Sequence, residues 1–229
     1  MKCSDVLKRF EEIKGVAFKE LCEEKDLQEL IDFAGKGNRT GSDKGKTGKL
    51  FESICGLDPS SKLVDLEDAE VKTYKKGQPI AISMLQHMLP EITKSVKFSE
   101  SLLCKKIERT LFVSVNKENN NPIEWFFDEF YLMDLQEQSE LFKKLEQEYK
   151  IISDIIKFRY DNDKMLSTIN GDGTKSKTSK SYLQIRTKDN KDSNGNYHST
   201  IYNGKIIGKR YYAFYFRNLF AREIIETTV

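Results

Sequence analysis

Histidine and cysteine are scarce in this sequence, and their scarcity argues against several kinds of catalytic and metal site. The 229 residues include only two histidines, His87 and His198, and four cysteines. Having only two histidines argues against a His-based zinc site and weakens any Ser/His or Cys/His triad. The cysteines, at positions 3, 22, 55 and 104, form no Cys-x-x-Cys pair. We interpret them as small apolar residues, buried or half-buried, in a protein of a reducing compartment.

Long apolar runs are also missing. No segment reaches the roughly 18 to 20 consecutive apolar residues that a membrane helix needs. The first five residues lead directly into a charged amphipathic pattern, without the apolar region of a secretory signal. We therefore expect a cytoplasmic protein with no membrane contact. The hydrophobic residues, 38% of the chain, suffice for one core, which can be divided between two lobes.

Net charge is small, but its distribution along the chain is uneven. The formal net charge is +2. Residues 164–218 contain eleven Lys or Arg against three Asp or Glu, whereas residues 121–150 contain eight acidic residues against three basic ones. A basic C-terminal third indicates a face that binds a polyanion such as nucleic acid. The alternative is the ordinary solvated surface of a lysine-rich protein.

Hydrophobic periodicity predicts a mixed α/β protein without regular βαβ units. We expect helices at residues 4–24 (with a break near Gly15), 27–34, 45–55, 135–159 and over the last dozen residues. Asp26 and Glu29 resemble a capping box for the second helix, which Gly35 would end. We expect strands at 69–74, 110–116, 123–132 and 182–187, a hairpin within 201–216, and a flexible basic loop at 170–180.

An acidic residue and a lysine stand two positions apart in one of these strands. Glu70 and Lys72 would point to the same face of the strand, and Asp65 lies just upstream. Two carboxylates offer oxygen ligands to a hard divalent cation, which can polarise a phosphate. The lysine can orient or deprotonate the attacking water. The pattern suits metal-dependent phosphodiester cleavage, although a surface strand with alternating Glu and Lys is far commoner.

A segment rich in glycine and lysine, Lys-Gly-Lys-Thr-Gly-Lys-Leu-Phe-Glu at residues 44–52, precedes this strand. Glu52 would project from its helix toward Glu70 as a further carboxylate of a metal site. Gly45 and Gly48 would allow close helix packing or the approach of a phosphate. The segment is not a P-loop, because the spacing GxxxxGK[ST] is missing.

Four segments in this order resemble the MutH mismatch-repair endonuclease family, which includes restriction enzymes that cut at GATC. They are residues 44–52, the Asp…Glu-x-Lys set at 65–72, Tyr-Leu-Gln-Ile-Arg-Thr-Lys at 182–188, and Phe-Tyr-Phe-Arg-Asn-Leu-Phe at 214–220. Each segment alone is a weak match, and the four together are fairly specific. Residues 76–180 contribute nothing to the resemblance.

The resemblance implies the PD-(D/E)xK nuclease fold, in which a central mixed sheet is flanked by helices and two lobes surround a DNA cleft. Residues 1–229 would form one domain, with about 1–110 and 111–229 contributing the lobes. Mg²⁺ would be the cofactor. By position, Glu52, Asp65, Glu70 and Lys72 would form the active site, and the three carboxylates would be the metal ligands.

The resemblance also implies that double-stranded DNA is the partner. Lys44 would assist near the active site. Arg186, Thr187 and Lys188 match residues that contact bases and phosphates, and an arginine can bond guanine O6 and N7 together. Tyr215 matches an aromatic position near a base that can be methylated. Arg186 could instead contact phosphate only.

The sequence departs from the family pattern at two points. The spacing between the aspartate and the glutamate is shorter here, so Asp65 is our first choice of ligand, with Asp68 and Glu67 as alternatives. Thr187 stands where the family typically has proline, which leaves the exact target open. Glu52 also has an alternative interpretation as an ordinary acid on a helix surface.

We therefore predict a sequence-specific, magnesium-dependent endonuclease, with a type II restriction enzyme of short target such as GATC as the preferred class. Cutting both strands of a symmetric site suggests a homodimer, and a restriction enzyme implies a cognate DNA methyltransferase. The alternatives are a strand-nicking repair endonuclease, a catalytically inactive DNA-binding module, and an interaction protein without affinity for DNA.

Overall fold

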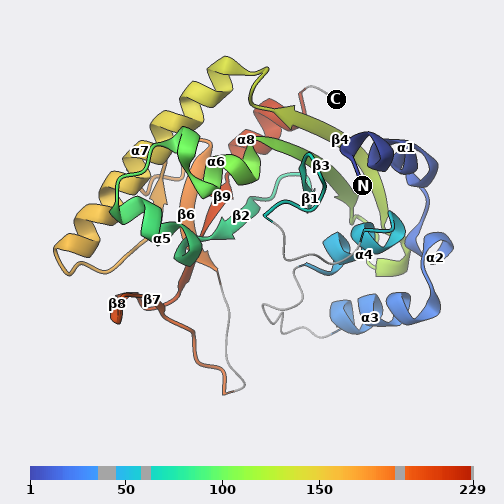
Figure 1. The fold of residues 1–229 in the computed structure, drawn as a ribbon. Coiled ribbons are helices and arrows are strands. Elements are labelled where there is room, and N and C mark those ends of the chain that lie inside the picture. The colour runs from blue at the N-terminus through green and yellow to red at the C-terminus, as the bar shows by residue number, and fades with distance from the viewer. Residues whose placement is uncertain (36–44, 58–62, 189–193, 228–229) are drawn as a thin grey trace. The chain divides into compact units, whose positions relative to one another are not determined.

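The computed structural model describes residues 1–35, 45–57, 63–188 and 194–227, and for residues 33–35 it describes the backbone alone. Its residues divide into two compact units that the chain enters alternately (Figure 1). Unit 1 comprises residues 1–76, 109–133 and 225–229, and unit 2 comprises 77–108 and 134–224. One boundary near residue 110 therefore does not describe this division, because the chain passes between the units four times.

Unit 1 combines short helices with a three-stranded sheet. Its elements are α1 (Cys3–Ile13), α2 (Phe18–Leu21), α3 (Glu24–Gly35), α4 (Lys46–Ile54), β1 (Glu70–Tyr74), β3 (Arg109–Asn116), η3 (Pro122–Glu124) and β4 (Phe126–Asp134), whose last residue lies in unit 2. The strand order is β1–β3–β4. β1 runs parallel to β3, with Glu70 opposite Thr110 and Tyr74 opposite Ser114.

Aromatic rings join the helices of unit 1 to its sheet. Phe127 of β4 is fully buried, with ring centroids 4.9 Å from Phe18 and 5.0 Å from Phe51. Phe51 lies on α4 and belongs to the same core as Val71 of β1. Burial of such large apolar side chains is the main stabilising contribution to a core of this kind. This shared core holds α4, which carries Glu52, against β1, which carries Glu70.

Unit 2 contains a four-stranded sheet, one long helix, several short helices and a separate hairpin. Its elements are β2 (Ile80–Met84), α5 (Leu85–Thr93), η2 (Phe98–Glu100), α6 (Leu102–Ile107), α7 (Ser139–Asp161), β5 (Ile169–Asn170), β6 (Leu183–Lys188), β7 (Thr200–Tyr202), β8 (Lys205–Gly208), β9 (Tyr211–Phe216), α8 (Asn218–Phe220) and the π-helical turn η4 (Ala221–Ile225). The sheet order is β2–β9–β6–β5, with antiparallel pairs, and β7 pairs with β8.

Helix α7 covers one face of the unit 2 sheet, where it contacts β5, β6 and α5 (Figure 1). Tyr149 of α7 stacks on Phe214 of β9, with ring centroids 6.1 Å apart, and both side chains are buried. Phe214 lies opposite Ile185 of β6. Side chains alternate along a strand, so the neighbours of these residues point to the other face of the sheet.

The structure confirms the mixed α/β class and most of the expected elements. The capping box is wrong, because α3 begins at Glu24 and therefore includes Asp26. The last strand, β9, joins the four-stranded sheet, and the hairpin is formed by β7 and β8 alone. Residues 80–107, for which no element was predicted, form β2, α5 and α6.

The cysteines behave as expected from their isolation. Cys3, Cys55 and Cys104 are buried, Cys22 is half-buried, and all four are free thiols. Burial raises the pKa of Cys22, Cys55 and Cys104 to about 11, so these thiols are poor nucleophiles at neutral pH.

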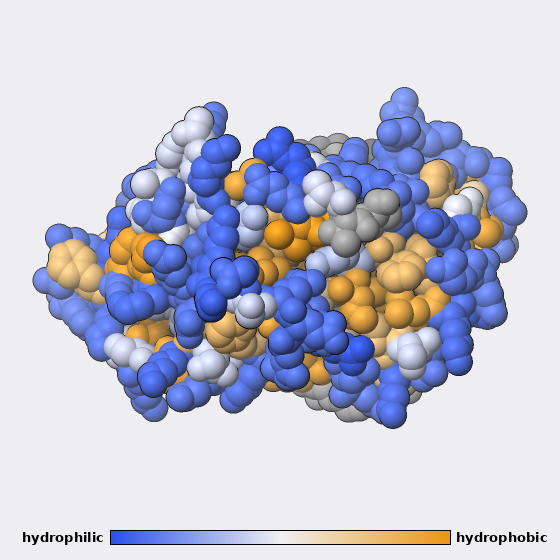
Figure 2. All heavy atoms as spheres, turned by 90° about the horizontal axis from the view of Figure 1, so that it is seen from above, coloured by the Kyte–Doolittle hydropathy of each residue, from blue (hydrophilic) through white to orange (hydrophobic). Residues whose placement is uncertain are grey.

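The limited apolar content of the sequence is visible both at the surface and in the helices. Most atoms in the view of Figure 2 belong to hydrophilic residues, with hydrophobic ones visible between them. Within the part of the chain that the structure describes, no helix is both long enough and apolar enough to span a membrane.

Candidate active site and basic groove

Strand β1 places an acid and a lysine on the same face. Glu70 begins the strand and is only 1% exposed, whereas the Lys72 side chain is 24% exposed. The Lys72 ammonium donates a hydrogen bond to the Glu70 carboxylate. The spacing of two residues therefore has the effect expected from strand geometry. The strand presents one nearly buried negative charge beside one accessible positive charge.

Helix α4 brings Glu52 near this strand because a glycine allows close packing. A Cβ atom at Gly48 would lie 3.4 Å from Thr73 Oγ1 of β1, at van der Waals contact, so the helix backbone packs closely on the strand at this residue. Gly45, in contrast, has open space around its Cα. Of the two roles expected of these glycines, close helix packing or the approach of a phosphate, the structure shows close packing for Gly48 and not for Gly45.

Asp65 is the acidic residue of segment 65–68 whose side chain turns to the start of β1. Its Oδ2 accepts a hydrogen bond from the Val71 amide at 3.1 Å. Asp68 points elsewhere: it accepts from the Cys3 amide at 2.7 Å and pairs with Arg109 at 2.8 Å. Glu67 pairs with the amino group of Met1 at 2.8 Å. These partners favour Asp65 over both alternatives as a site residue.

The charges of Asp65, Glu70 and Lys72 all act on the Glu52 carboxyl group. Burial raises the pKa of Glu52 above its usual value, and the negative charges of Asp65 and Glu70 raise it further. The positive charges of Lys72 and Lys49 lower it in part. The negative charges of Asp65 and Glu70, from two other chain segments, therefore disfavour a third negative charge on Glu52. Such crowding of like charges in a partly buried place is typical of functional sites.

The donor set suits magnesium better than the softer metals. Among the described residues, no three His, Cys, Asp or Glu side chains form a ready-made metal-binding group. Magnesium does not require one, because it usually keeps several waters and takes one or two carboxylates together with substrate phosphates. Carboxylate oxygens without imidazole or thiolate also fit a hard cation. Asp65, Glu70 and Glu52 are therefore compatible with Mg²⁺.

The raised pKa of Glu52 gives a prediction about stability. A carboxyl group whose pKa is higher in the folded state stabilises the fold below its unfolded pKa, and this contribution is lost as pH rises through the folded pKa. The wild-type protein should therefore lose stability relative to Glu52→Gln between about pH 4 and about pH 7. Urea unfolding at both pH values measures this. Parallel changes in the two proteins would contradict the proposed charge crowding at Glu52.

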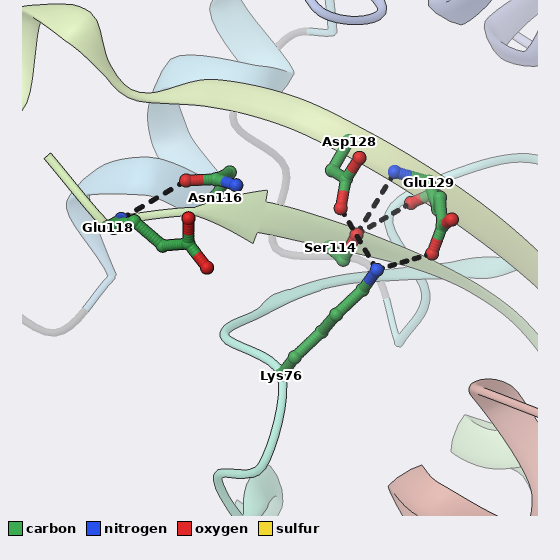
Figure 3. Close-up of polar contacts among 6 residues, drawn as sticks. All are labelled: Lys76, Ser114, Asn116, Glu118, Asp128 and Glu129. Atoms are coloured by element: carbon green, nitrogen blue, oxygen red, sulfur yellow. Dashed lines mark hydrogen bonds and ion pairs between the residues drawn. The ribbon is translucent and has the colours of Figure 1, made fainter.

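Asp128 and Glu129 form an acidic pair in unit 1 that binds Lys76 and has a structural role. Lys76 Nζ lies 3.0 Å from Asp128 Oδ2 and 2.5 Å from Glu129 Oε2 (Figure 3). The Glu129 amide donates to Ser114 Oγ at 3.0 Å. Burial lowers the pKa of Lys76, but its hydrogen bonds to both carboxylates outweigh this and raise the pKa overall. These contacts tie the segment after β1 to β3 and β4.

In unit 2, the expected DNA-binding residues lie on two neighbouring strands. Gln184 of β6 is opposite Tyr215 of β9, so Arg186 and Tyr215 share a face, and the Arg186 guanidinium lies 5.4 Å from the Tyr215 ring centroid. Lys188 follows two residues later on that face. Thr187 alternates to the opposite face and is not brought together with them. Lys44 lies outside the described residues.

Arg186 also lines a groove of about 720 Å³ in unit 2. The other cationic residues along it are Lys175, Lys177, Lys180, Arg217 and Arg222. None of the described residues that line the groove is acidic. Five of the eleven Lys and Arg residues of segment 164–218, together with Arg222, therefore line one concave surface. Such a surface attracts a polyanion.

Sequence analysis named only part of this groove. The lysines were recognised as a basic loop, and Arg186 as a recognition residue. Arg217 and Arg222 were not singled out, because each stands alone among apolar or polar neighbours in the C-terminal segment. Only the three-dimensional arrangement brings them to the same surface as residues 175–180.

Comparison with known protein families found no family model that matches this chain, and comparison with curated proteins found no match either.

Proposed function

We propose that this protein is a magnesium-dependent endonuclease that cuts double-stranded DNA at a short specific sequence. The observation that carries the proposal is the placement of Asp65 and Glu70 at the start of β1 beside Lys72, with Glu52 of α4 near enough for the charges of all three to act on its carboxyl group. A surface strand with alternating charges would not require a helix and a separate loop to bring two further acids to the same place. The resemblance of four segments, in the same order, to the MutH family points to the same residues.

Each residue has a role that its position supports. Asp65 and Glu70 would hold the metal ion, with Glu52 as a further acidic neighbour. Bound magnesium would supply charge stabilisation at the phosphate and the leaving oxygen. Lys72 lies at the Glu70 carboxylate with its ammonium partly accessible. As an ammonium it would orient the attacking water and favour the negatively charged transition state, and it could accept the proton of that water only after giving up one of its own.

DNA recognition is assigned to unit 2. Arg186 is exposed, and its guanidinium fork can bond both O6 and N7 of a guanine. Tyr215 beneath it restricts its orientation through a cation–π contact. The groove that begins at Arg186 offers further positive charges for the backbone.

The experiment that tests the function is plasmid cleavage with and without magnesium. The substrates carry GATC in unmethylated, hemimethylated and fully methylated form. Discrete magnesium-dependent fragments are expected, and sequencing of their ends gives the target. The same gel separates cutting of both strands from nicking. No cleavage of any substrate by folded protein in magnesium would overturn the proposal.

Two accompanying proposals depend on that outcome. If both strands are cut at a symmetric site, we propose a homodimer, because each catalytic unit cuts one strand. The molecular mass in solution with a target duplex measures this. A restriction role would also require a methyltransferase that protects the same sequence. Protection of GATC plasmids by methylation would support that role.

A catalytically inactive DNA-binding module is the second candidate. The basic groove favours binding by itself, and the described residues include no ready-made group of three metal ligands. This candidate predicts duplex binding without cleavage under every magnesium condition. It also predicts that magnesium leaves the thermal midpoint of the protein unchanged, whereas a metal site would raise it through binding to the native state.

A further inference from the structure

The loop that supplies three of the groove's lysines is built from closely spaced hydrogen bonds. Asn170 Nδ2 donates to the Ser176 carbonyl at 2.8 Å. Asp172 Oδ1 accepts from the amide and the hydroxyl of Thr174, at 2.9 and 2.7 Å. The Ser181 amide donates to Ser179 Oγ at 3.2 Å. These bonds replace the flexible loop expected from its composition with a series of defined turns.

Arg217 bonds to the C-terminal half of this loop. Its Nη1 atom donates to the Ser179 carbonyl at 2.7 Å and to the Ser181 carbonyl at 2.9 Å. Its Nη2 atom lies 3.4 Å from the Lys177 carbonyl. One planar guanidinium therefore bonds backbone carbonyls on both sides of Lys180. A lysine could not do this, because its ammonium is a single point with no fixed fork.

The side chains of Lys175, Lys177 and Lys180 are exposed at the groove, while the backbone beneath them is fixed. Fixing the backbone that carries three lysines before binding reduces the entropy lost when they meet a ligand. Lysine is a point charge without base-reading geometry, so it suits phosphate oxygens, whereas Arg186 can read a base edge. Arg222 adds a further exposed cation along the same groove.

We propose that the loop 170–181 is a preformed clamp for the phosphate backbone of duplex DNA, and that Arg217 is its positioning residue. Lys175, Lys177 and Lys180 contact successive phosphates, and Arg217 holds the carbonyls between them. The clamp sets affinity and leaves sequence preference to Arg186. This inference rests on the proposed function for its ligand, duplex DNA, but not on the catalytic carboxylates.

The first test is the salt dependence of binding, measured by fluorescence anisotropy with a labelled duplex in EDTA. The slope of log K against log salt is negative, and each lost phosphate contact makes it shallower by about 0.9. The triple variant Lys175→Gln, Lys177→Gln, Lys180→Gln should bind on the order of 10-fold more weakly at low salt, with a shallower slope. The loss should be equal for GATC and scrambled duplexes.

A matched control removes three lysines of unit 2 that do not line the groove. Lys94, Lys105 and Lys150 are exposed, and their replacement by glutamine makes the same change in net charge. This control should keep the wild-type slope. Equal effects of the two triple variants would overturn the clamp, because they would show attraction by overall charge alone.

The second test separates positioning from charge at Arg217. Arg217→Lys keeps the positive charge but loses the fork, so amide hydrogen exchange at residues 171–181 should accelerate and the salt slope should become shallower. If Arg217 acts only as a charge, Arg217→Lys binds DNA with the wild-type affinity and slope. That result would overturn its positioning role, even if the unfolding midpoint of the variant falls.

Failure of this inference can be distinguished from failure of the proposed function. Wild-type protein that cuts DNA, together with a lysine triple variant that binds as wild type, overturns the clamp alone. Wild-type protein that binds in EDTA but never cuts overturns the nuclease, while the slopes still decide the clamp. Absence of any duplex binding at low salt overturns both.

Discussion

Glu70→Gln and Lys72→Ala are expected to abolish DNA cutting while duplex binding persists. Glu70→Gln keeps the shape of the side chain but removes the charge that would hold a divalent cation. Lys72→Ala removes the group that would orient the nucleophile. Loss of a positioned general base or of a charge-stabilising group typically costs about 10²- to 10⁴-fold in rate. Single-turnover cleavage of a target duplex in magnesium measures the loss.

Matched controls are available in the same unit. Lys75→Gln changes an exposed lysine three residues from Lys72, and Glu67→Gln changes an exposed acid three residues from Glu70. Both should cut at the wild-type rate. Wild-type cutting by either site variant would show that the active site is misassigned. Loss of binding together with cutting would give Glu70 and Lys72 a role in forming the fold instead.

The local parts of this site could be predicted from sequence because they depend on short spacings. The strand near residue 70 has β-branched and aromatic residues, and two residues along a strand restore the same face. The helix at 45–55 has apolar residues at helical spacing. Gly48 marked its close approach to the strand, although the sequence could not show which of the two glycines makes it.

The choice among the acids of segment 65–68 could not be made from sequence. It depends on what each carboxylate meets in the fold. Asp68 bonds to Cys3 and to Arg109, which lie 65 and 41 residues away along the chain. Asp65 meets the backbone of Val71. No local pattern encodes such distant contacts.

The elements missed between residues 80 and 107 have local causes. β2 is only five residues long, and its pairing with β9 contains an irregularity between Ala81 and Ser83 that the sequence cannot show. α5 carries Pro90 inside the helix, where proline normally predicts a break. Tertiary packing of buried residues such as Leu89 overrides that local signal.

Glu148→Ala is expected to cause the largest loss of stability among the polar substitutions considered. Glu148 lies on α7 and is 6% exposed. Its carboxylate accepts the Tyr182 amide at 2.8 Å and the Leu183 amide at 2.6 Å, where β6 begins. Alanine leaves two buried amides without acceptors, each worth about 1–3 kcal/mol. Burial raises the pKa of Glu148. At neutral pH, the cost of desolvating its carboxylate therefore offsets part of the stabilisation that the two hydrogen bonds provide.

We therefore expect Glu148→Ala to lower the free energy of unfolding by about 3 kcal/mol, measured by urea unfolding near pH 7. Glu148→Gln keeps one oxygen acceptor and should lose less. Gly171→Ala should also destabilise, because its Cβ would lie 2.6 Å from Glu148 Cβ. Glu140→Ala, on the exposed side of the same helix, is the control and should stay within about 0.5 kcal/mol of wild type.

Substitution of Glu148 should also affect DNA binding, because its carboxylate lies beside both ends of the loop 170–181 and at the start of β6. The amide of Gly171 donates to the Leu183 carbonyl at 2.8 Å, so the loop 170–181 starts and ends beside the Glu148 carboxylate. Loss of this anchor frees both the lysine loop and the strand that carries Arg186. Glu148→Gln, which should remain folded, is therefore expected to weaken duplex binding as well as stability. A variant with wild-type affinity and salt slope would show that the anchor serves the fold alone.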